Sequence, residues 1–265
     1  MNDNKEELKG AQIVVGTPGR TFDMIRREYL DAYSIKLLIL DEADEMLSGD
    51  FKNQIKNIIY ELPKDIQICL FSATITEETL KLTNEFMNDP YQLLIKKEEL
   101  TLEGIKQFYI NVEKEQNKFD TLCDIYGTLV ISQSIVYVNT KNKADWIKER
   151  LKEKNFTVGV IHSEMLSSER SDILKGFRNG ANRVLVSTDL LSRGIDIQQV
   201  SIVINYDLPN NNECYIHRIG RSGRYGRKGV SINFITTRDT RRMKEIEDFY
   251  GIVTESMPTN INEYM

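Results

Sequence analysis

The sequence predicts an α/β fold with mostly parallel sheets covered by helices, and two observations lead to this prediction. Short apolar runs rich in β-branched residues alternate along the chain with amphipathic stretches of helical period. Polar clusters follow directly after several of these runs, and in open parallel sheets the ligand sites lie beyond the carboxyl ends of the strands. The 265 residues can form two small α/β domains or one large one.

The apolar runs mark the expected strands in chain order. In the first part of the chain they are residues 12–15, 36–40 and 67–71. In the second part they are residues 108–112, 134–138, 157–161, 183–186, 201–205 and 230–235. The expected helices are residues 19–27, 51–60, 77–86, 118–130, 143–152, 167–177 and 238–250. The tail, residues 257–265, carries weak structural signals and is expected to fray.

A domain boundary is predicted near residues 97–105. A charge-dense stretch at residues 96–99 precedes residues 100–104, which lack clear periodicity. We therefore predict a first domain over 1–97, a linker over 98–105 and a second domain over 106–265. The second domain has five or six expected strands and the first only three, so we expect the first to be incomplete and poorly stable alone.

Composition excludes some classes of protein. The net charge is −5 and the isoelectric point about 5.3, which argues against coating nucleic acid by bulk charge but leaves a local basic groove open. No apolar run approaches the roughly 18 residues of a membrane helix, and the polar, acidic N-terminus does not resemble a secretory signal. The three cysteines lack CxxC spacing, which favours buried thiols in a reducing compartment over a metal or redox site.

The strongest single motif is the sequence LLILDEAD at residues 37–44. An apolar strand ends there in three carboxylates, and adjacent acids suit phosphoryl chemistry. One acid can hold Mg²⁺, usually through water, while the next orients or deprotonates an attacking water. The alternative is an acidic turn after a strand, and the tetrapeptide alone leaves the two interpretations about even.

Hydroxyl side chains follow the next expected strand, at Ser72 and Thr74. Neighbouring strand ends would place them close to the acids, where they could tie these acids to another domain. The alternative is that a threonine here caps the next helix, and in isolation we favour capping.

A basic run at residues 217–228 reads HRIGRSGRYGRK, with four arginines at a spacing of three. The planar fork of arginine suits phosphate oxygens, and an arginine that reaches a γ-phosphate is a known catalytic device. The alternative is a solvated basic turn, which the regular Arg/Gly spacing disfavours.

Three further loops offer phosphate-binding groups. Residues 187–196, STDLLSRGID, combine hydroxyls, an arginine and a glycine, so they can bind a phosphodiester backbone, and Asp196 could accept from a ribose hydroxyl. An ordinary βα turn is an equal alternative there. Residues 16–20 open a helix whose N–H groups can receive a phosphate, and the pair at 139–140 is a polar loop at a strand end. Each of these two signals is weak alone.

The order of the motifs is more specific than any one of them. TPGR, DEAD, SAT, IVYVNT, STDLLSRGID and HRIGRSGR follow one another from Gly10 onward, and this order resembles that of the DEAD-box RNA helicases. Flanking text such as LDEADEML and KFDTLCDIY is similar to the translation initiation factor 4A family. The runs YDLPNN and GRSGRYGRKG resemble its exon-junction-core relative.

The resemblance implies tandem RecA-like domains, the first incomplete, that use ATP and Mg²⁺ and bind single-stranded RNA with little sequence preference. The residues implied to be catalytic are Asp41 (also the Mg²⁺ ligand, through water), Glu42, Arg221 and Arg224. Those implied to couple the domains are Asp44, Ser72, Thr74 and His217, and Asp196 is implied to bind the ATP ribose. Those implied to bind RNA are Thr17, Pro18, Gly19, Arg20, Asn139, Thr140, Arg170, Thr188 and Arg193.

The sequence also departs from the family pattern. The family has a glycine after the histidine of its HGD motif, whereas this chain has Ser163 there, followed by Glu164. Ser167, three residues before Arg170, stands where the family has a glutamine. Both departures put the fine geometry of the RNA track in doubt. No Gly-Lys dipeptide occurs in the chain, so the family's phosphate-binding GxxxxGK[ST] loop is missing. We therefore expect an N-terminally truncated helicase that is inactive by itself.

Two alternatives remain open at this point: a non-catalytic RNA-binding or protein-binding module, and an incomplete gene model. Translation initiation, splicing-linked deposition and ribosomal RNA processing all fit the motifs. Partners could be translation-initiation or exon-junction proteins, and the location could be the cytoplasm or the nucleus, with no membrane involved.

Overall fold

The computed structural model describes residues 6, 8–74, 77–94, 104–192, 200–223, 228–259 and 261–264. The chain divides into two compact units, Met1–Leu93 (unit 1) and Leu94–Met265 (unit 2). Within the described residues, none of the helices combines the length and the apolar character that crossing a lipid bilayer requires. The predicted domain limits stay a prediction, since most of the linker 98–105 lies outside the described residues.

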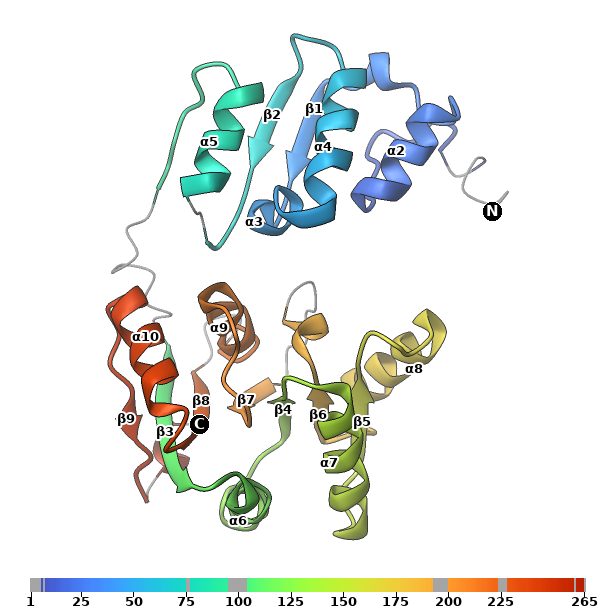
Figure 1. Cartoon of the computed structure of the whole chain (residues 1–265). Coiled ribbons are helices and arrows are strands. Elements are labelled where there is room, and N and C mark those ends of the chain that lie inside the picture. The colour runs from blue at the N-terminus through green and yellow to red at the C-terminus, as the bar shows by residue number, and fades with distance from the viewer. Residues whose placement is uncertain are drawn as a thin grey trace. The chain divides into compact units, whose positions relative to one another are not determined.

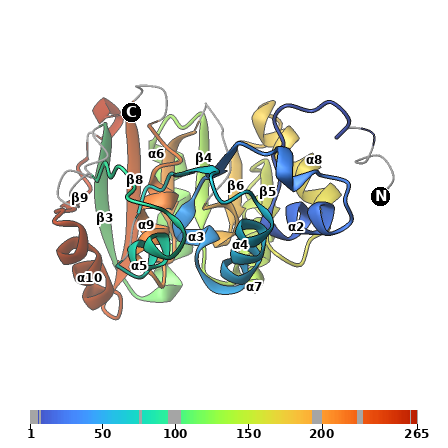
Figure 2. The same ribbon diagram turned by 90° about the horizontal axis from the view of Figure 1, so that it is seen from above.

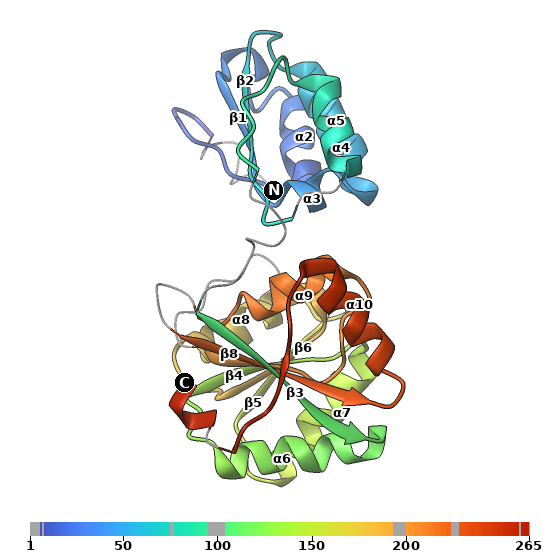
Figure 3. The ribbon, with the colours of Figure 1, turned by 90° about the vertical axis from the view of Figure 1, so that its left-hand side faces the viewer.

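Unit 1 places helices against one face of a small parallel sheet (Figures 1 and 3). Its strands β1 and β2 pair in register from Leu37 with Gln67 to Leu40 with Leu70. In chain order its elements are α2 (Pro18–Arg26), the 3₁₀ helix η1 (Ala32–Ser34), β1 (Leu37–Leu40), α3 (Ala43–Met46), α4 (Gly49–Glu61), β2 (Gln67–Leu70) and α5 (Glu77–Phe86).

The core of unit 1 lies between the sheet and its helices. Leu40 of β1 packs with Ile25 of α2, Ile55 and Ile58 of α4 and Leu82 of α5. The stripe predicted along residues 51–60 is therefore the buried face of α4. On the other face of the sheet, Leu37 and Ile39 are about half exposed.

The prediction of a strand at residues 12–15 is wrong. These residues run without strand pairing in the described structure, and Ile13 and Val15 point into solvent. A β-branched run becomes a strand only where a neighbouring strand accepts its backbone hydrogen bonds, and within the described part of unit 1 the sheet consists of β1 and β2.

Unit 2 is built on a parallel sheet whose strands lie side by side in Figure 2. Among its described residues the strand order is β5-β6-β4-β7-β8-β3-β9, and every pairing is parallel. In chain order its elements are β3 (Ile105–Glu113), η3 (Glu115–Asn117), α6 (Lys118–Thr128), β4 (Gln133–Tyr137), α7 (Lys141–Glu153), β5 (Val158–Ile161), α8 (Ser167–Arg178), β6 (Val184–Ser187), η4 (Asp189–Leu191), β7 (Val200–Asn205), α9 (Asn212–Ile219), β8 (Gly229–Thr236), α10 (Thr240–Tyr250), β9 (Glu255–Ser256) and η6 (Ile261–Tyr264).

Helices cover both faces of the unit 2 sheet, as Figure 3 shows. Residues of α6 and α7 pack on one face with Val136 and Val138. On the other face α8 contributes Phe177, which packs near Ile135 and Tyr137, and α9 and α10 form a further cluster. Strands buried on both faces explain the continuous apolar runs in the sequence, and the predicted α/β class is confirmed.

The tail expected to fray is instead packed against unit 2. Ile261 is fully buried in the core beside α6 and α7. The ring of Tyr264 meets Phe108 edge to face, with centroids 5.5 Å apart. Met257 packs against the same core, and its N–H donates to the Tyr109 carbonyl at 3.0 Å. Apolar contacts therefore dock a segment whose sequence carries no periodicity.

Candidate functional site

The DEAD motif forms a tight turn between β1 and α3. Asp41 and Glu42 directly follow the last strand residue, and Glu42 has left-handed backbone angles, φ 51° and ψ 49°. Its N–H donates to Asp41 Oδ1 at 2.9 Å, and the N–H of Ala43 donates to the Phe71 carbonyl at 3.0 Å. A non-glycine residue in this region is strained, and such residues cluster at functional sites.

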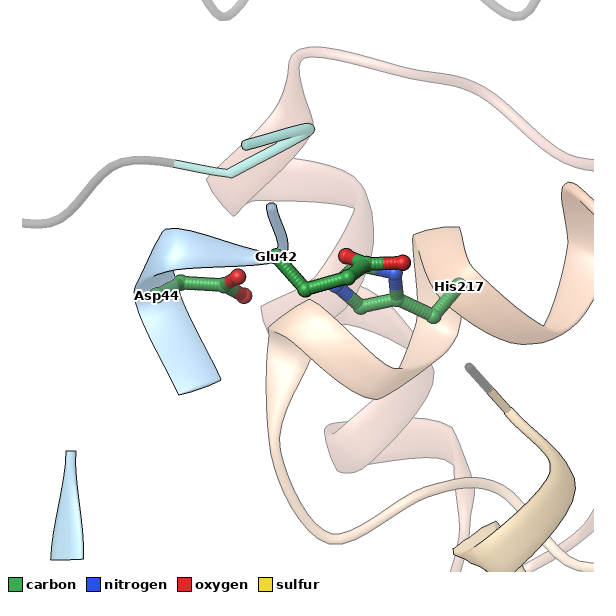
Figure 4. Close-up of side chains that lie close together, drawn as sticks. All are labelled: Glu42, Asp44 and His217. Carbon is green, nitrogen blue, oxygen red and sulfur yellow. The ribbon is translucent and has the colours of Figure 1, made fainter. Parts of the chain in front are cut away.

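Asp44 lies in the first turn of α3 and binds both hydroxyls that follow β2; Figure 4 shows its carboxylate beside Glu42. Ser72 Oγ lies 2.8 Å from Asp44 Oδ1, and Thr74 Oγ1 donates to Asp44 Oδ2 at 2.7 Å. Ser72 Oγ also lies 2.6 Å from the Thr74 carbonyl oxygen. The adjacency expected from the two strand ends is therefore present, and the Thr74 hydroxyl binds an acid.

The TPGR motif begins helix α2. Thr17 is its N-cap residue in extended conformation, and Pro18 occupies the first helical position, where a missing N–H costs nothing. A Cβ on Gly19 would lie 3.0 Å from Gln54 Oε1, so α4 packs close to this turn. Arg20 reaches Asp23 Oδ2 at 3.2 Å. Helix N–H groups here suit an anion.

In unit 2 the expected RNA-binding residues of two loops follow neighbouring strands. Asn139 and Thr140 come after β4, and Thr188 comes after β6, which pairs with β4. Thr140 caps α7 by accepting from Lys143 N at 3.3 Å. Asn139 donates its side-chain amide to the Leu208 carbonyl at 2.8 Å. These side chains therefore have internal partners as well as exposed surface.

Arg170 lies in the first turn of α8 and is half exposed. The departures at Ser163 and Glu164 lie just before this helix, and Glu164 forms an ion pair with Lys141 at the start of α7. The hydrogen bond from Lys141 within this ion pair holds the pKa of the Glu164 carboxyl below its ordinary value. The Glu164 carboxylate therefore offsets the positive charge of Lys141, which directly follows Thr140.

The basic run begins within α9 (Asn212–Ile219), which the sequence did not predict. His217 lies on this helix (Figure 4), and Arg221 Nε donates to the His217 carbonyl at 3.0 Å. Arg218 has no exposed surface, so it does not belong to a solvated basic turn. Arg193, Asp196 and Arg224 lie outside the described residues.

Arg218 is the central side chain that sequence reasoning missed. Its Nε donates to Asp189 Oδ1 at 2.6 Å, and its Nη2 donates to Asn139 Oδ1 at 3.0 Å. Its Nη1 donates to the Asp207 carbonyl at 2.7 Å. Its neighbours Ile216 and Ile219 are buried too, and these flanking apolar residues are the signal in the sequence that could have indicated a buried arginine.

A buried charge cluster surrounds Asp207, which follows β7. Asp207 Oδ1 lies 3.1 Å from Lys118 Nζ and 2.8 Å from Lys143 Nζ, and Asp207 Oδ2 accepts from Asn139 N at 3.0 Å. Burial by itself would raise the pKa of Asp207. The hydrogen bond from Lys143 and the charge of Lys118 outweigh burial, so this pKa lies below its ordinary value.

Family models match both units of the chain. Residues 1–83 match the "DEAD/DEAH box helicase" model and residues 117–226 match the "Helicase conserved C-terminal domain" model. The chain belongs to the DEAD-box helicase family. The predicted resemblance is thereby confirmed, and the family as a whole uses ATP, Mg²⁺ and RNA.

Individual relatives agree with this family assignment. An "ATP-dependent RNA helicase eIF4A" of Candida albicans is 56% identical over 262 residues, which are 98% of this chain and 66% of that protein. The chain thus spans about two thirds of the curated relatives it matches. The resemblance to the factor 4A family is confirmed, while the exon-junction relative stays a prediction.

Solved structures of DEAD-box proteins also match the chain. Dbp5 of S. cerevisiae bound to RNA and ADP BeF3 matches with a TM-score of 0.88 and 37% identity, over 96% of this chain and 67% of that chain. The structure of the C-terminal domain of Dbp5 matches with a TM-score of 0.56 and 39% identity, over 60% of this chain and 93% of that chain. The RecA-like parallel-sheet class is therefore confirmed.

Proposed function

We propose that this chain carries the RNA-binding and ATP-handling groups of an ATP-dependent RNA helicase, in which RNA binding and unwinding or clamping are coupled to ATP hydrolysis. The observation that carries the proposal is the strained Asp41-Glu42 turn at the end of β1, followed by Asp44 with both hydroxyl partners. A turn of this kind presents two carboxylates beyond a strand end, where ligands of parallel sheets bind.

The residues of this turn fit Mg²⁺ and ATP phosphates. Asp41 is exposed and Glu42 half exposed, and carboxylate oxygens are the hard ligands that Mg²⁺ takes, usually through water. Asp41 would hold the ion, and the ion would neutralise charge on the phosphates. Glu42 would accept a proton from the attacking water. Arg221 would reach the γ-phosphate, and we keep Arg224 and Asp196 as further candidates.

RNA would be held through its backbone. Unit 1 offers the α2 N-terminus with Thr17, Pro18, Gly19 and Arg20. Unit 2 offers Asn139, Thr140, Arg170, Thr188 and Arg193. These groups suit phosphate and sugar oxygens, which carry no sequence information, so binding should show little sequence preference.

The expected coupling of the two units rests on four side chains, Asp44, Ser72, Thr74 and His217. In unit 1 the hydroxyls of Ser72 and Thr74 fix the Asp44 carboxylate. A carboxylate fixed in this way is pre-organised to receive a cationic or hydrogen-bonding group. We propose this role for the three residues and for His217, which lies on a separate unit.

A second candidate is a non-catalytic RNA-binding or protein-binding module. It is favoured by the absence of any Gly-Lys dipeptide from the 265 residues, because the phosphate loop normally supplies backbone N–H groups and a lysine to the phosphates. The 265-residue chain by itself is then expected to bind RNA and to be inactive in ATP hydrolysis.

The proposal is tested by the binding of single-stranded oligouridine and oligoadenine RNA to the 265-residue chain in a gel-shift assay at low salt. We expect similar affinities for both and weaker binding as salt rises. Absence of binding at low salt, or strong preference for one sequence, would contradict it. Translation-initiation or exon-junction proteins as partners, and a cytoplasmic or nuclear location, stay predictions.

A further inference from the structure

Arg218 of α9 has hydrogen-bond partners on three separate loops of unit 2. Its Nε donates to Asp189 Oδ1 at 2.6 Å, in the segment that follows β6. Its Nη1 donates to the Asp207 carbonyl at 2.7 Å and to Asn205 Oδ1 at 3.2 Å, where β7 ends. Its Nη2 donates to Asn139 Oδ1 at 3.0 Å, after β4. One guanidinium therefore connects the carboxyl ends of neighbouring strands.

The partners of Arg218 lie beside the groups proposed to bind RNA. Asn139 is one of these groups, and Asp189 directly follows Thr188. The ring of Tyr137 lies 5.1 Å from the guanidinium carbon, and its hydroxyl donates to the Leu191 carbonyl at 3.0 Å. The contacts of Arg218 thus fix the start of both loops.

We infer that Arg218 is a positioning residue, which holds the loops at Asn139 and Thr188 in the geometry that binds an RNA backbone. It also ties these loops to α9, which carries His217. The inference rests on the proposed function and deepens it. Because Arg218 has no exposed surface, it acts on RNA through its partners.

Only an arginine can make this set of contacts. Its guanidinium carries five N–H donors in a fixed plane, and the four described hydrogen bonds use all three nitrogens. A lysine keeps the positive charge that faces Asp189 but offers one nitrogen on a flexible stem. Arg218→Lys therefore separates the charge of residue 218 from its geometry.

The test measures the affinity of the 265-residue chain for a fluorescein-labelled oligouridine of about ten nucleotides, by fluorescence anisotropy at low salt. Arg218→Lys and Asp189→Asn should each weaken binding by about tenfold or more, because misplaced contact groups lose most of their effect. Circular dichroism checks that each variant is folded at the assay temperature.

Tyr126→Phe is the matched control for a general loss of stability. The Tyr126 hydroxyl lies 2.6 Å from Ser134 Oγ in the same unit. Ser134 lies near the start of β4, at the opposite end of this strand from Asn139. Tyr126→Phe should lower the melting temperature and leave the RNA affinity within about twofold.

A double-mutant cycle then shows whether Arg218 acts through Asn139. If it does, Arg218→Lys costs less RNA affinity in an Asn139→Ala background than in the unchanged chain. Equal losses in the two backgrounds would assign the effect to another route and overturn the part of the inference that concerns Asn139.

The inference is overturned if folded Arg218→Lys and Asp189→Asn bind RNA like the unchanged chain, or if Tyr126→Phe weakens binding as much as they do. Should Arg218→Lys fail to fold, Asp189→Asn decides, because it removes the charge that pairs with Arg218 and leaves the buried arginine in place. Absence of RNA binding by the unchanged chain would overturn the proposed function and this inference together, whereas normal binding by the variants overturns the inference alone.

Discussion

Thr74 Oγ1 donates a 2.7 Å hydrogen bond to Asp44 Oδ2, and this bond joins the segments that follow two paired parallel strands. Thr74→Val keeps the shape of the side chain and removes the donor. We expect it to lower the free energy of unfolding of unit 1 by about 2 kcal/mol, because a carboxylate loses a charge-assisted hydrogen bond.

Urea unfolding followed by circular dichroism measures this loss. Ser34→Ala serves as its control, since it removes an exposed hydroxyl that donates to the Asp31 carbonyl and should change stability by less than about 0.5 kcal/mol. Equal stability of Thr74→Val and the unchanged chain would show that the bond to Asp44 contributes nothing to the fold.

The sequence predicted the parts of the fold that depend on buried strands. Residues 135–138 are apolar throughout because both faces of β4 are covered. Residues 12–15 have the same character and form no strand, because pairing depends on a neighbour and not on the run itself. Helix α9 was missed because its eight residues include a histidine and an arginine, both of which are buried.

The candidate site was predictable only where chemistry follows a strand directly. The acids of the DEAD motif and the hydroxyls at Ser72 and Thr74 come together because β1 and β2 pair in parallel. The internal roles of Lys118 and Arg218 were not predictable, since charged side chains are seldom fully buried. Their burial depends on partners distant in the sequence, such as Asp207.

Glu42 carries backbone strain that a glycine would relieve. We compare Glu42→Gly with Glu42→Ala, because both variants lose the carboxylate and differ only in their tolerance of φ 51°. Glu42→Gly should be more stable by about 1 kcal/mol in thermal unfolding. If Glu42→Ala is as stable as Glu42→Gly, the left-handed turn is not a strained feature of the motif.

Asp207 should make unit 2 sensitive to acid. Its pKa is held below the ordinary value of 3.8, so the ionised carboxylate stabilises the fold above that value, and this contribution is lost as the pH falls through the folded-state pKa. Asp207→Asn should destabilise unit 2 by about 3 kcal/mol at neutral pH, since it removes the buried carboxylate that Lys118 and Lys143 share and leaves the more exposed Glu115 as their nearest acidic partner.

Urea unfolding over about pH 3 to 7 tests the predicted loss of stability with falling pH. The stability of Asp207→Asn should fall less steeply with decreasing pH than that of the unchanged chain. Asp120→Asn, at an exposed position of α6, should retain the original pH dependence. An identical acid slope for Asp207→Asn would contradict the depressed pKa.

Gly229 allows β8 to begin against the turn of the basic motif. A Cβ there would lie 2.5 Å from Gly223 N and 2.7 Å from Ser222 Oγ. Gly229→Ala should therefore destabilise unit 2 by about 2 kcal/mol or more, because backbone atoms cannot move aside as a flexible side chain can.

Gly127→Ala is the matched control, since a Cβ in that part of α6 has no neighbour within 4 Å. It should stabilise the same unit by up to about 1 kcal/mol through helix propensity. Thermal unfolding of the two variants should therefore give shifts of opposite sign. A stable Gly229→Ala variant would mean that the turn at Gly223 does not pack against β8.

We propose that the turn at Asp41 and Glu42 belongs to an ATP-hydrolysing site, and RNA-stimulated phosphate release tests this proposal most directly. The 265-residue chain alone should release no phosphate above background. Fused to a segment of a DEAD-box protein that carries a GxxxxGK[ST] loop, it should hydrolyse ATP when RNA is added, and Glu42→Gln in that fusion should abolish turnover. Hydrolysis by the 265-residue chain alone, or unchanged turnover with Glu42→Gln, would contradict this proposal.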